Sequence, residues 1–293
     1  MVAAGVVRPG SSDGFDGSRL SRCGLNWSST GDVRVDFVKE VVNRVSPRCR
    51  MWDTTNTFAE IEASRADMAI LPVGAIEQHG DHLPVWVDWK QADALGTGIA
   101  GRLNGLLLPA LPFGNSEAHA GFRGSISIRP ETLQSLVTDI VGSLFSQGFQ
   151  RVVVVNMHGG NLVLKLAVRA LNMSGTAGRV LLVFPPQLAA SRLTEIFPQL
   201  NDEMHAGDLE TSLMMHLTPD HVRPGGVNHV PDVSPVFFDY APMKSYCPAG
   251  VWGRAGEATA EKGRRALEIM VDETVKHIES TFRQLEELPH GEP

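Results

Sequence analysis

Cysteine is scarce in this sequence. Only three of the 293 residues are cysteines, Cys23, Cys49 and Cys247, and they lie far apart. An odd number of widely spaced cysteines argues against a disulfide framework and against a zinc site built from thiolates. Because disulfides are rare in reducing compartments, we expect a cytoplasmic protein.

Long apolar runs and clusters of one charge are also missing. No stretch of about 18 uninterrupted apolar residues occurs, so no segment is expected to span a bilayer, and the first residues lack the apolar core of a signal peptide. The 26 Lys and Arg and the 33 Asp and Glu residues give a net charge of −7. The two signs are well mixed, which leaves no basic stripe for a phosphate backbone. The sequence therefore predicts neither a membrane nor a nucleic-acid partner.

Several familiar catalytic motifs are absent. There is no H-E-x-x-H helix, no G-x-x-x-x-G-K-[ST] loop, and no G-x-S-x-G elbow between a predicted strand and a predicted helix, which removes the usual zincin, P-loop and serine hydrolase chemistries. The run Gly96–Gly101 matches G-x-G-x-x-G. It follows a helical stretch, however, whereas the dinucleotide fingerprint requires a strand, a turn and a helix. That misplaced pattern is the only support for a nucleotide-dependent oxidoreductase.

What is present is an alternation of buried strands and helices from residue 68 onward. The apolar patterns predict strands at 68–74, 106–110, 152–155 and 180–184, and helices at 90–103, 133–148, 162–173, 206–217 and 257–284. This alternation predicts an α/β fold, a three-layer sandwich with a mainly parallel sheet covered by helices on both faces. The segment that begins at Trp52 is expected to form a capped helix.

The chain is predicted to contain one folded domain. Residues 1–32 are rich in Gly and Ser and have no apolar period, so we expect a disordered N-terminal extension there. No internal repeat and no linker interrupts residues 68–284. We therefore assign residues 33–293 to a single catalytic domain.

Polar side chains gather after the first of the strands from residue 68 onward. Glu77, His79, Asp81, His82 and Asp88 fall within twelve positions, at a strand end where parallel sheets collect ligands. Carboxylate and imidazole together suit zinc, manganese or iron better than calcium or magnesium. A solvated surface loop is the alternative for any one of these residues, but the set favours a metal site.

Further candidates follow two other strands. His158 comes after the valine run and before two glycines, which allow a metal or substrate to approach the backbone closely. A hydrogen-bonded core histidine is the alternative there. Ser116 and His119 lie in a glycine-bounded loop after the strand at 106–110, and we expect both to contact the substrate.

A last group precedes and opens the predicted helix 206–217. His205 is followed by Asp208 and Glu210, which are two residues apart and therefore face different ways on a helix. We expect one carboxylate to point into the site and the other into solvent. Aromatic walls for a pocket, or core packing instead, are the two interpretations of Trp86, Trp89, Tyr246 and Trp252.

In order and spacing, these motifs resemble the creatininase family of metal-dependent amidohydrolases. The resemblance covers residues 68–278 and rests on short runs: L-P-V-G-A-I-E-Q-H-G at 71–80, L-P at 83–84 with Asp88, G-N-S-E-A-H and G-S-I-S within 114–127, N-M-H-G-G-N at 156–161, H-A-G-D-L-E-T-S at 205–212, and G-V-W-G with A-E-K-G within 250–263. The resemblance implies a homohexamer of α/β sandwiches, each with two divalent metal ions, zinc or else manganese or iron.

The resemblance also implies roles for individual residues. One ion would be bound by Glu77 and His158, the other by His79 with Glu210, and Asp88 would bridge the two. A metal-bridging hydroxide would attack the amide carbonyl. His205 would then transfer a proton to the leaving nitrogen.

Two departures indicate a substrate other than creatinine. The creatinine-hydrolysing member carries a carboxylate two residues after the histidine matching His158, where this chain has Gly160. It also carries a tryptophan four residues before the histidine matching His205, where this chain has Asn201. Related members with the H-G-G-N sequence include a deformylase and a peptidase that trims a cofactor precursor.

We therefore predict a dinuclear metal amidohydrolase. It is expected to cleave a C–N amide bond in a small-molecule substrate, whether a cyclic amide, another non-peptide amide such as a formamide, or a peptide-like molecule. The alternative is a catalytically silent ligand-binding or assembly subunit with the same fold.

Overall fold

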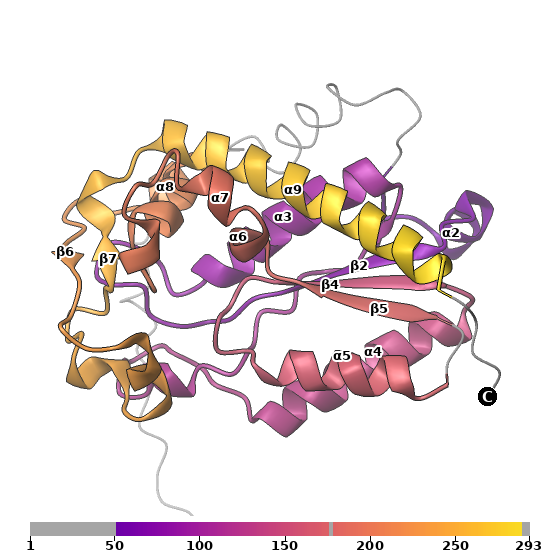
Figure 1. Cartoon of the computed structure of the whole chain (residues 1–293), viewed down its shortest axis with the longest axis horizontal. Coiled ribbons are helices and arrows are strands. Elements are labelled where there is room, and N and C mark those ends of the chain that lie inside the picture. The colour runs from indigo at the N-terminus through magenta and orange to yellow at the C-terminus, as the bar shows by residue number, and fades with distance from the viewer. Residues whose placement is uncertain (1–50, 176–177, 289–293) are drawn as a thin grey trace, which may run out of the picture. The chain divides into compact units, whose positions relative to one another are not determined.

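The computed structural model describes residues 51–175 and 178–288 (Figure 1). The predicted extension, residues 1–32, lies outside them, as does the beginning of the predicted domain. Within the described residues the chain forms a five-stranded sheet with the order β1-β3-β2-β4-β5, in which all neighbours are parallel. The strands are β1 Trp52–Asp53, β2 Met68–Val73, β3 Leu106–Leu107, β4 Arg151–Asn156 and β5 Arg179–Val183.

Helices cover both faces of this sheet. On one face lie α4 (Pro130–Ser146) and α5 (Val163–Met173), and on the other lie α3 (Val87–Leu103) and α9 (Ala260–Glu286) (Figure 1). Successive side chains of β4 enter different cores, because a strand points them alternately to opposite faces. Val152 and Val154 pack with α4 and α5, while Val153 and Val155 pack with α3 and α9. The predicted α/β sandwich with a parallel sheet is confirmed.

Shorter elements complete the described part of the chain. They are α2 Phe58–Ser64, α6 Pro185–Leu188, α7 Ala190–Leu193, α8 Asp208–Leu217, and an antiparallel pair of β6 Asn228–His229 with β7 Gly253–Arg254. Among the described residues no helix combines the length and the apolar character needed to cross a membrane.

Several element boundaries differ from the prediction. The capped helix predicted in the segment from Trp52 is present but begins later: Trp52 lies in β1, and α2 begins at Phe58, after Thr57, which forms a capping box with Glu60. Strand β3 ends at Leu107 instead of 110, shortly before Pro109, which has no N–H for a ladder. Helix α3 begins at Val87 instead of 90, which places the Asp88 carboxylate in the first helical turn, where the helix dipole favours it.

A glycine allows α9 to pack closely on α8. A Cβ atom at Gly263 would overlap the backbone oxygen of Ser212, so Gly263→Ala is expected to destabilise the protein by about 1–3 kcal/mol through overpacking. Gly142 in α4 is the matched control, because no atom lies within 4 Å of an added Cβ. There the higher helix propensity of alanine is expected to stabilise the protein by about 0.5–1 kcal/mol. Urea denaturation midpoints measure both changes, and a shift of the same sign for the two variants would contradict this packing.

Candidate metal centre

The five predicted metal ligands converge at the carboxyl ends of β2 and β4. These strands pair with Val73 opposite Asn156, so the segments that follow them leave the sheet side by side. The converging side chains are Glu77 and His79 after β2, His158 after β4, Asp88 in the first turn of α3 and Glu210 in the first turn of α8.

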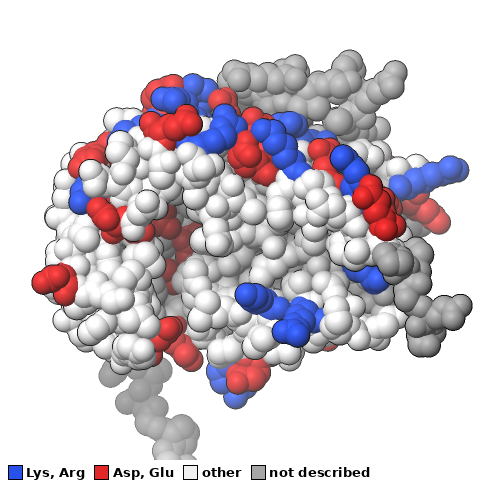
Figure 2. Space-filling model, in the orientation of Figure 1, with Lys and Arg blue, Asp and Glu red and all other residues white. Residues whose placement is uncertain are grey.

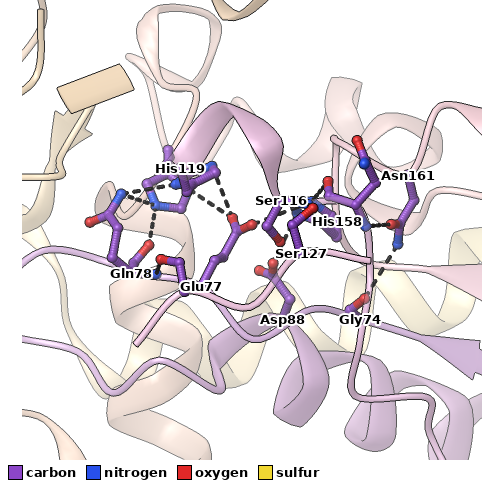
Figure 3. A network of polar contacts seen from close by, with 12 residues as sticks. Gly74, Glu77, Gln78, Asp88, Ser116, His119, Ser127, His158 and Asn161 are labelled. Carbon is purple, nitrogen blue, oxygen red and sulfur yellow. Dashed lines mark hydrogen bonds and ion pairs between the residues drawn. The ribbon is translucent and has the colours of Figure 1, made fainter. Parts of the chain in front are cut away.

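Close backbone contacts hold the loops of the site together (Figure 3). Gly74, directly after β2, packs on the first turn of α3, where an added Cβ atom would lie only 2.5 Å from the Trp89 Cα atom. Asn161 joins three segments: its Oδ1 accepts the Asn115 N–H (2.9 Å), and its Nδ2 donates to Asn156 Oδ1 (3.0 Å) and to the Gly74 carbonyl (3.3 Å). The site is therefore built on closely packed backbone, although its side chains come from distant parts of the sequence.

Asp88 lies between two imidazoles. Its Oδ1 is 3.1 Å from His79 Nε2, and its Oδ2 is 3.1 Å from His158 Nδ1. On one side Glu77 Oε2 is 3.3 Å from His158 Nε2, and on the other Glu210 Oε2 is 3.9 Å from His79 Nε2. The side chains form two groups of three possible ligands that share Asp88: Glu77–Asp88–His158 and His79–Asp88–Glu210. Within each group the ligand atoms lie within 4.8 Å of one another.

Two carboxylate oxygens of this cluster are buried and make no hydrogen bond of good geometry. Glu77 is 1% exposed and Asp88 is 2% exposed, yet Glu77 Oε2 and Asp88 Oδ2 lie outside hydrogen-bonding geometry. Leaving a buried carboxylate oxygen unsatisfied is costly, and a divalent cation would remove that cost. The mixed imidazole and carboxylate donors fit zinc, manganese or iron, so the residues present fit the metal ions that the sequence predicts.

The protonation of each residue in the cluster depends on the charges of its neighbours. Burial raises the pKa of Glu77 to about 7, although the nearby His158 opposes it. Burial alone would lower the pKa of His79, but the Asp88 carboxylate raises it to about 10, and the Glu77 carboxylate likewise raises that of His158 to about 9 against burial. Without metal, these imidazoles therefore carry protons that neutralise the carboxylates, and metal ions would take over that neutralising role.

His205 and His119 lie against the same carboxylate. His205 Nδ1 is 3.7 Å from Glu77 Oε1, and its ring centre is 4.2 Å from that of His79. His119 Nε2 is 3.1 Å from Glu77 Oε1. The structure thus places the predicted proton-transfer residue at the cluster, and places the predicted substrate contact His119 on a candidate metal ligand. His205 also completes a third group of possible ligands with Glu77 and His79.

Ser116, the other predicted substrate contact, is buried beside Glu77 (Figure 3). Its backbone N–H donates to Ser127 Oγ (2.9 Å), while its own hydroxyl is buried without a hydrogen-bond partner in the described part of the chain. The hydroxyl nevertheless lies close enough to the Glu77 carboxylate to lower the pKa of that carboxyl, against the larger effect of burial.

Aromatic rings lie along one side of the site, and Glu210 is the most exposed of the five candidate ligands. The Phe238 ring lies 6.2 Å from His119 and stacks on Trp252 at 5.4 Å, with Tyr246 edge-on to Trp252. Glu210 keeps 23% side-chain exposure, and Figure 2 shows acidic side chains inside a hollow of the face drawn. Pattern reasoning missed Phe238 because a single aromatic in an irregular segment carries no period.

Other predicted residues lie outside the cluster. Asp208 is not solvated, as one of the two helix carboxylates was predicted to be, but buried in an ion pair with Lys262. His82 is buried and contacts Thr211 Oγ1 at 2.9 Å, whereas Asp81 is exposed. Trp86 packs edge-on to Trp89 and to His221, and neither tryptophan contacts the cluster imidazoles in the ring contacts of the described residues.

Gly160 is required by the geometry of the site. A Cβ atom there would overlap the Asn115 carbonyl oxygen and lie 2.5 Å from His158 Nε2. A carboxylate cannot occupy this position without displacing the loop. Glu210, which reaches in from α8, lies on the other side of Asp88, beside His79.

Comparison with known proteins agrees with this geometry. Residues 53–278 match the family model described as "Creatininase: Creatinine amidohydrolase". The chain is 32% identical over 240 residues to the mycofactocin precursor peptide peptidase of Mycobacterium ulcerans (strain Agy99), covering 76% of this chain and 89% of the relative. It is also 32% identical over 249 residues to the creatinine amidohydrolase of Pseudomonas putida, covering 77% of this chain and 95% of the relative.

Solved structures extend the comparison to the fold. A creatininase variant described as "Zn-Zn type" superposes with a TM-score of 0.68 at 29% identity, and a creatininase described as "Mn" with a TM-score of 0.67 at 30% identity. Each comparison covers 80% of this chain and 99% of the solved chain. The sequence match, the parallel sheet and the buried carboxylate–imidazole cluster lead to one conclusion: the chain belongs to the creatininase family.

Proposed function

We propose that this protein is a metal-dependent hydrolase that cleaves a C–N amide bond in a small or peptide-like substrate. The observation that carries the proposal is the pair of three-residue groups that share the buried Asp88. Two buried oxygens in that pair, on Glu77 and Asp88, lie near His158 but make no hydrogen bond of good geometry, which supports a cation-binding role. Relatives named as an amidohydrolase and as a peptide peptidase support the reaction class.

We assign five residues to two divalent ions, zinc or else manganese or iron. Glu77 and His158 would hold one ion, His79 and Glu210 the other, and Asp88 would contact both. When bound, such ions polarise a carbonyl and lower the pKa of bound water so that hydroxide exists near neutral pH. The solved creatininases described with zinc and manganese support this choice of metals.

His205 is the proposed proton-transfer residue. Burial, together with the nearby His79, holds the pKa of His205 well below its usual range, so the ring is neutral at pH 7. Its Nδ1 faces Glu77, from where it can accept a proton from the attacking water and pass that proton to the leaving nitrogen. An amide nitrogen leaves poorly unless it is protonated, which is why the reaction needs this group.

The substrate is proposed to be an amide other than creatinine. Gly160 stands where the creatinine enzyme has a carboxylate, and the neighbouring Asn115 carbonyl and His158 ring leave no room for a side chain at this position. The Ser116 hydroxyl and the Phe238 and Trp252 rings offer one polar contact and an apolar wall, as in most small-molecule sites. We further propose a homohexamer in the cytoplasm, as the family resemblance and the scarce cysteines suggest.

A metal-reconstitution screen tests the proposed function. Protein stripped with a chelator is reloaded with zinc, manganese or iron and offered lactams, formamides, linear amides, short peptides and creatinine. We expect two metal equivalents per chain and hydrolysis of at least one amide class by the loaded protein alone. Full activity in the stripped protein would contradict the metal dependence. Two bound ions without turnover of any class would favour the silent ligand-binding subunit.

A further inference from the structure

Gln78 is buried between the two candidate ligands Glu77 and His79, and its side chain points away from the metal-binding groups. The amide lies against two imidazoles: its Nε2 is 3.0 Å from His119 Nδ1 and 3.1 Å from His205 Nε2. The backbone of the same residue also reaches the site, because the Gln78 carbonyl oxygen is 2.6 Å from His205 Nε2. One residue thus contacts both histidines that lie against Glu77.

The orientation of the Gln78 amide is determined by its neighbours. Its Oε1 accepts the backbone N–H of Gly80 at 2.9 Å, and an N–H can only donate. The opposite orientation would place two donors against each other at that contact. Oε1 occupies the space that a Cβ atom on Gly250 would fill, so this position of the amide requires a glycine at residue 250. The amide NH₂ group therefore faces His119 and the Met243 sulfur, which lies 3.4 Å away.

This orientation determines which nitrogen of His119 carries the proton. Because the amide donates to Nδ1, that nitrogen must be unprotonated, and the neutral ring then carries its proton on Nε2. His119 Nε2 lies 3.1 Å from Glu77 Oε1, so the ring donates to the carboxylate. The chain of hydrogen bonds runs from the backbone N–H of Gly80 through the Gln78 amide and the His119 ring to Glu77.

The backbone of Gln78 determines the tautomer of His205 in the same way. At 2.6 Å from a carbonyl oxygen, His205 Nε2 must be protonated and donate, because two lone pairs would repel at that distance. The 3.1 Å contact with the amide nitrogen is then a contact between two donors. The shorter bond to the carbonyl oxygen determines which ring nitrogen carries the proton. Nδ1 of His205 is left unprotonated, 3.7 Å from Glu77 Oε1.

We propose that Gln78 is a positioning residue that sets the tautomers of both site histidines, so that His119 presents an N–H donor to Glu77 and His205 presents a bare Nδ1 to the site. The tautomers themselves follow from the contacts, and their part in amide hydrolysis rests on the proposed function. Outer partners of this kind typically change metal affinity or activity about 10- to 100-fold when removed.

Nitrogen NMR of the full chain with ¹⁵N-labelled histidine tests the tautomers directly, in the metal-free and the zinc-loaded protein. Both rings are expected to show the Nε2–H pattern in the metal-free protein. Gln78→Glu keeps the acceptor for Gly80 but replaces the donor to His119 by an acceptor, so His119 alone is expected to change to a ring protonated at Nδ1. Gln91→Glu is the matched control: Gln91 is a buried amide whose Nε2 contacts the Glu210 carbonyl oxygen at 3.4 Å, and this variant is expected to leave the His119 pattern unchanged.

Kinetics with the best amide found in the reconstitution screen test the consequence. Gln78→Met, which removes the amide, is expected to lower kcat by about 10- to 100-fold while KM changes little. A wild-type His119 protonated at Nδ1 or at both nitrogens, a Gln78→Glu spectrum identical to wild type, or an unchanged kcat would each overturn the inference. If no amide is hydrolysed, the proposed function fails, and the spectra still decide the tautomers.

Discussion

Replacing Asp88 by Asn is expected to remove bound metal and to lower kcat/KM by about 1,000-fold or more, which corresponds to about 4 kcal/mol of transition-state stabilisation. Asp88 is the one residue shared by both three-residue groups, with one oxygen toward His79 and the other toward His158. The amide of asparagine keeps the volume but loses the charge and one acceptor. Both ion sites should therefore weaken together.

Metal content by atomic spectroscopy and steady-state kinetics measure this prediction. Asp208→Asn is the matched control, because Asp208 is also a buried carboxylate at the start of a helix but pairs with Lys262 outside the cluster. That variant should lose some stability and keep its metal. Two retained equivalents and normal turnover in Asp88→Asn would refute the shared-ligand arrangement.

Replacing His205 by Ala is expected to lower kcat by about 10²- to 10⁴-fold, the usual contribution of a positioned acid or base, while the two ions stay bound. The ring lies against Glu77 and is held by the Gln78 carbonyl, outside the two groups that share Asp88. A substrate whose leaving nitrogen is activated, such as a nitroanilide, needs less help from a proton donor. The loss should therefore be smaller for the activated amide than for an ordinary one.

The control for this variant is His82→Ala. His82 is buried as well but contacts Thr211 and not the cluster, so its removal should leave kcat within a few-fold of wild type. Loss of one metal equivalent in His205→Ala would instead make His205 a ligand, as its place in the third possible group would permit. An equal loss for both leaving groups would rule out the proton-transfer role.

Much of the fold is predictable from local patterns. The four valines of β4 and the apolar run of β2 indicate burial on both faces, and burial of that kind is typical of a parallel sheet. The capping-box spacing of Thr57 and Glu60 marks the helix start at Phe58 more closely than Trp52 does. The predicted helix start at residue 90 leaves Asp88 in a loop, although it lies in the first turn of α3.

The sequence predicts which residues reach the candidate site, but not every contact that these residues make there. Glu77, His79 and His158 stand directly after predicted strands, and parallel strands place such residues at one edge of the sheet. His119 is predicted to contact substrate, yet it lies on the Glu77 carboxylate. Gln78 attracts no prediction at all, because a neutral amide has no characteristic spacing.

The sequence by itself determined the α/β class, the family and the residues that reach the carboxyl edge of the sheet, because each of these depends on local period or on ordered motifs. The tertiary structure places Asp88 between His79 and His158 and Glu210 beside His79, as the family resemblance implies. It alone decided that Gly160 excludes a side chain and that Asp208 pairs with Lys262 away from the cluster. The reason is physical. Contacts between segments separated by tens of residues depend on strand register and on close backbone approach. Neither of these can be read from local patterns in the sequence.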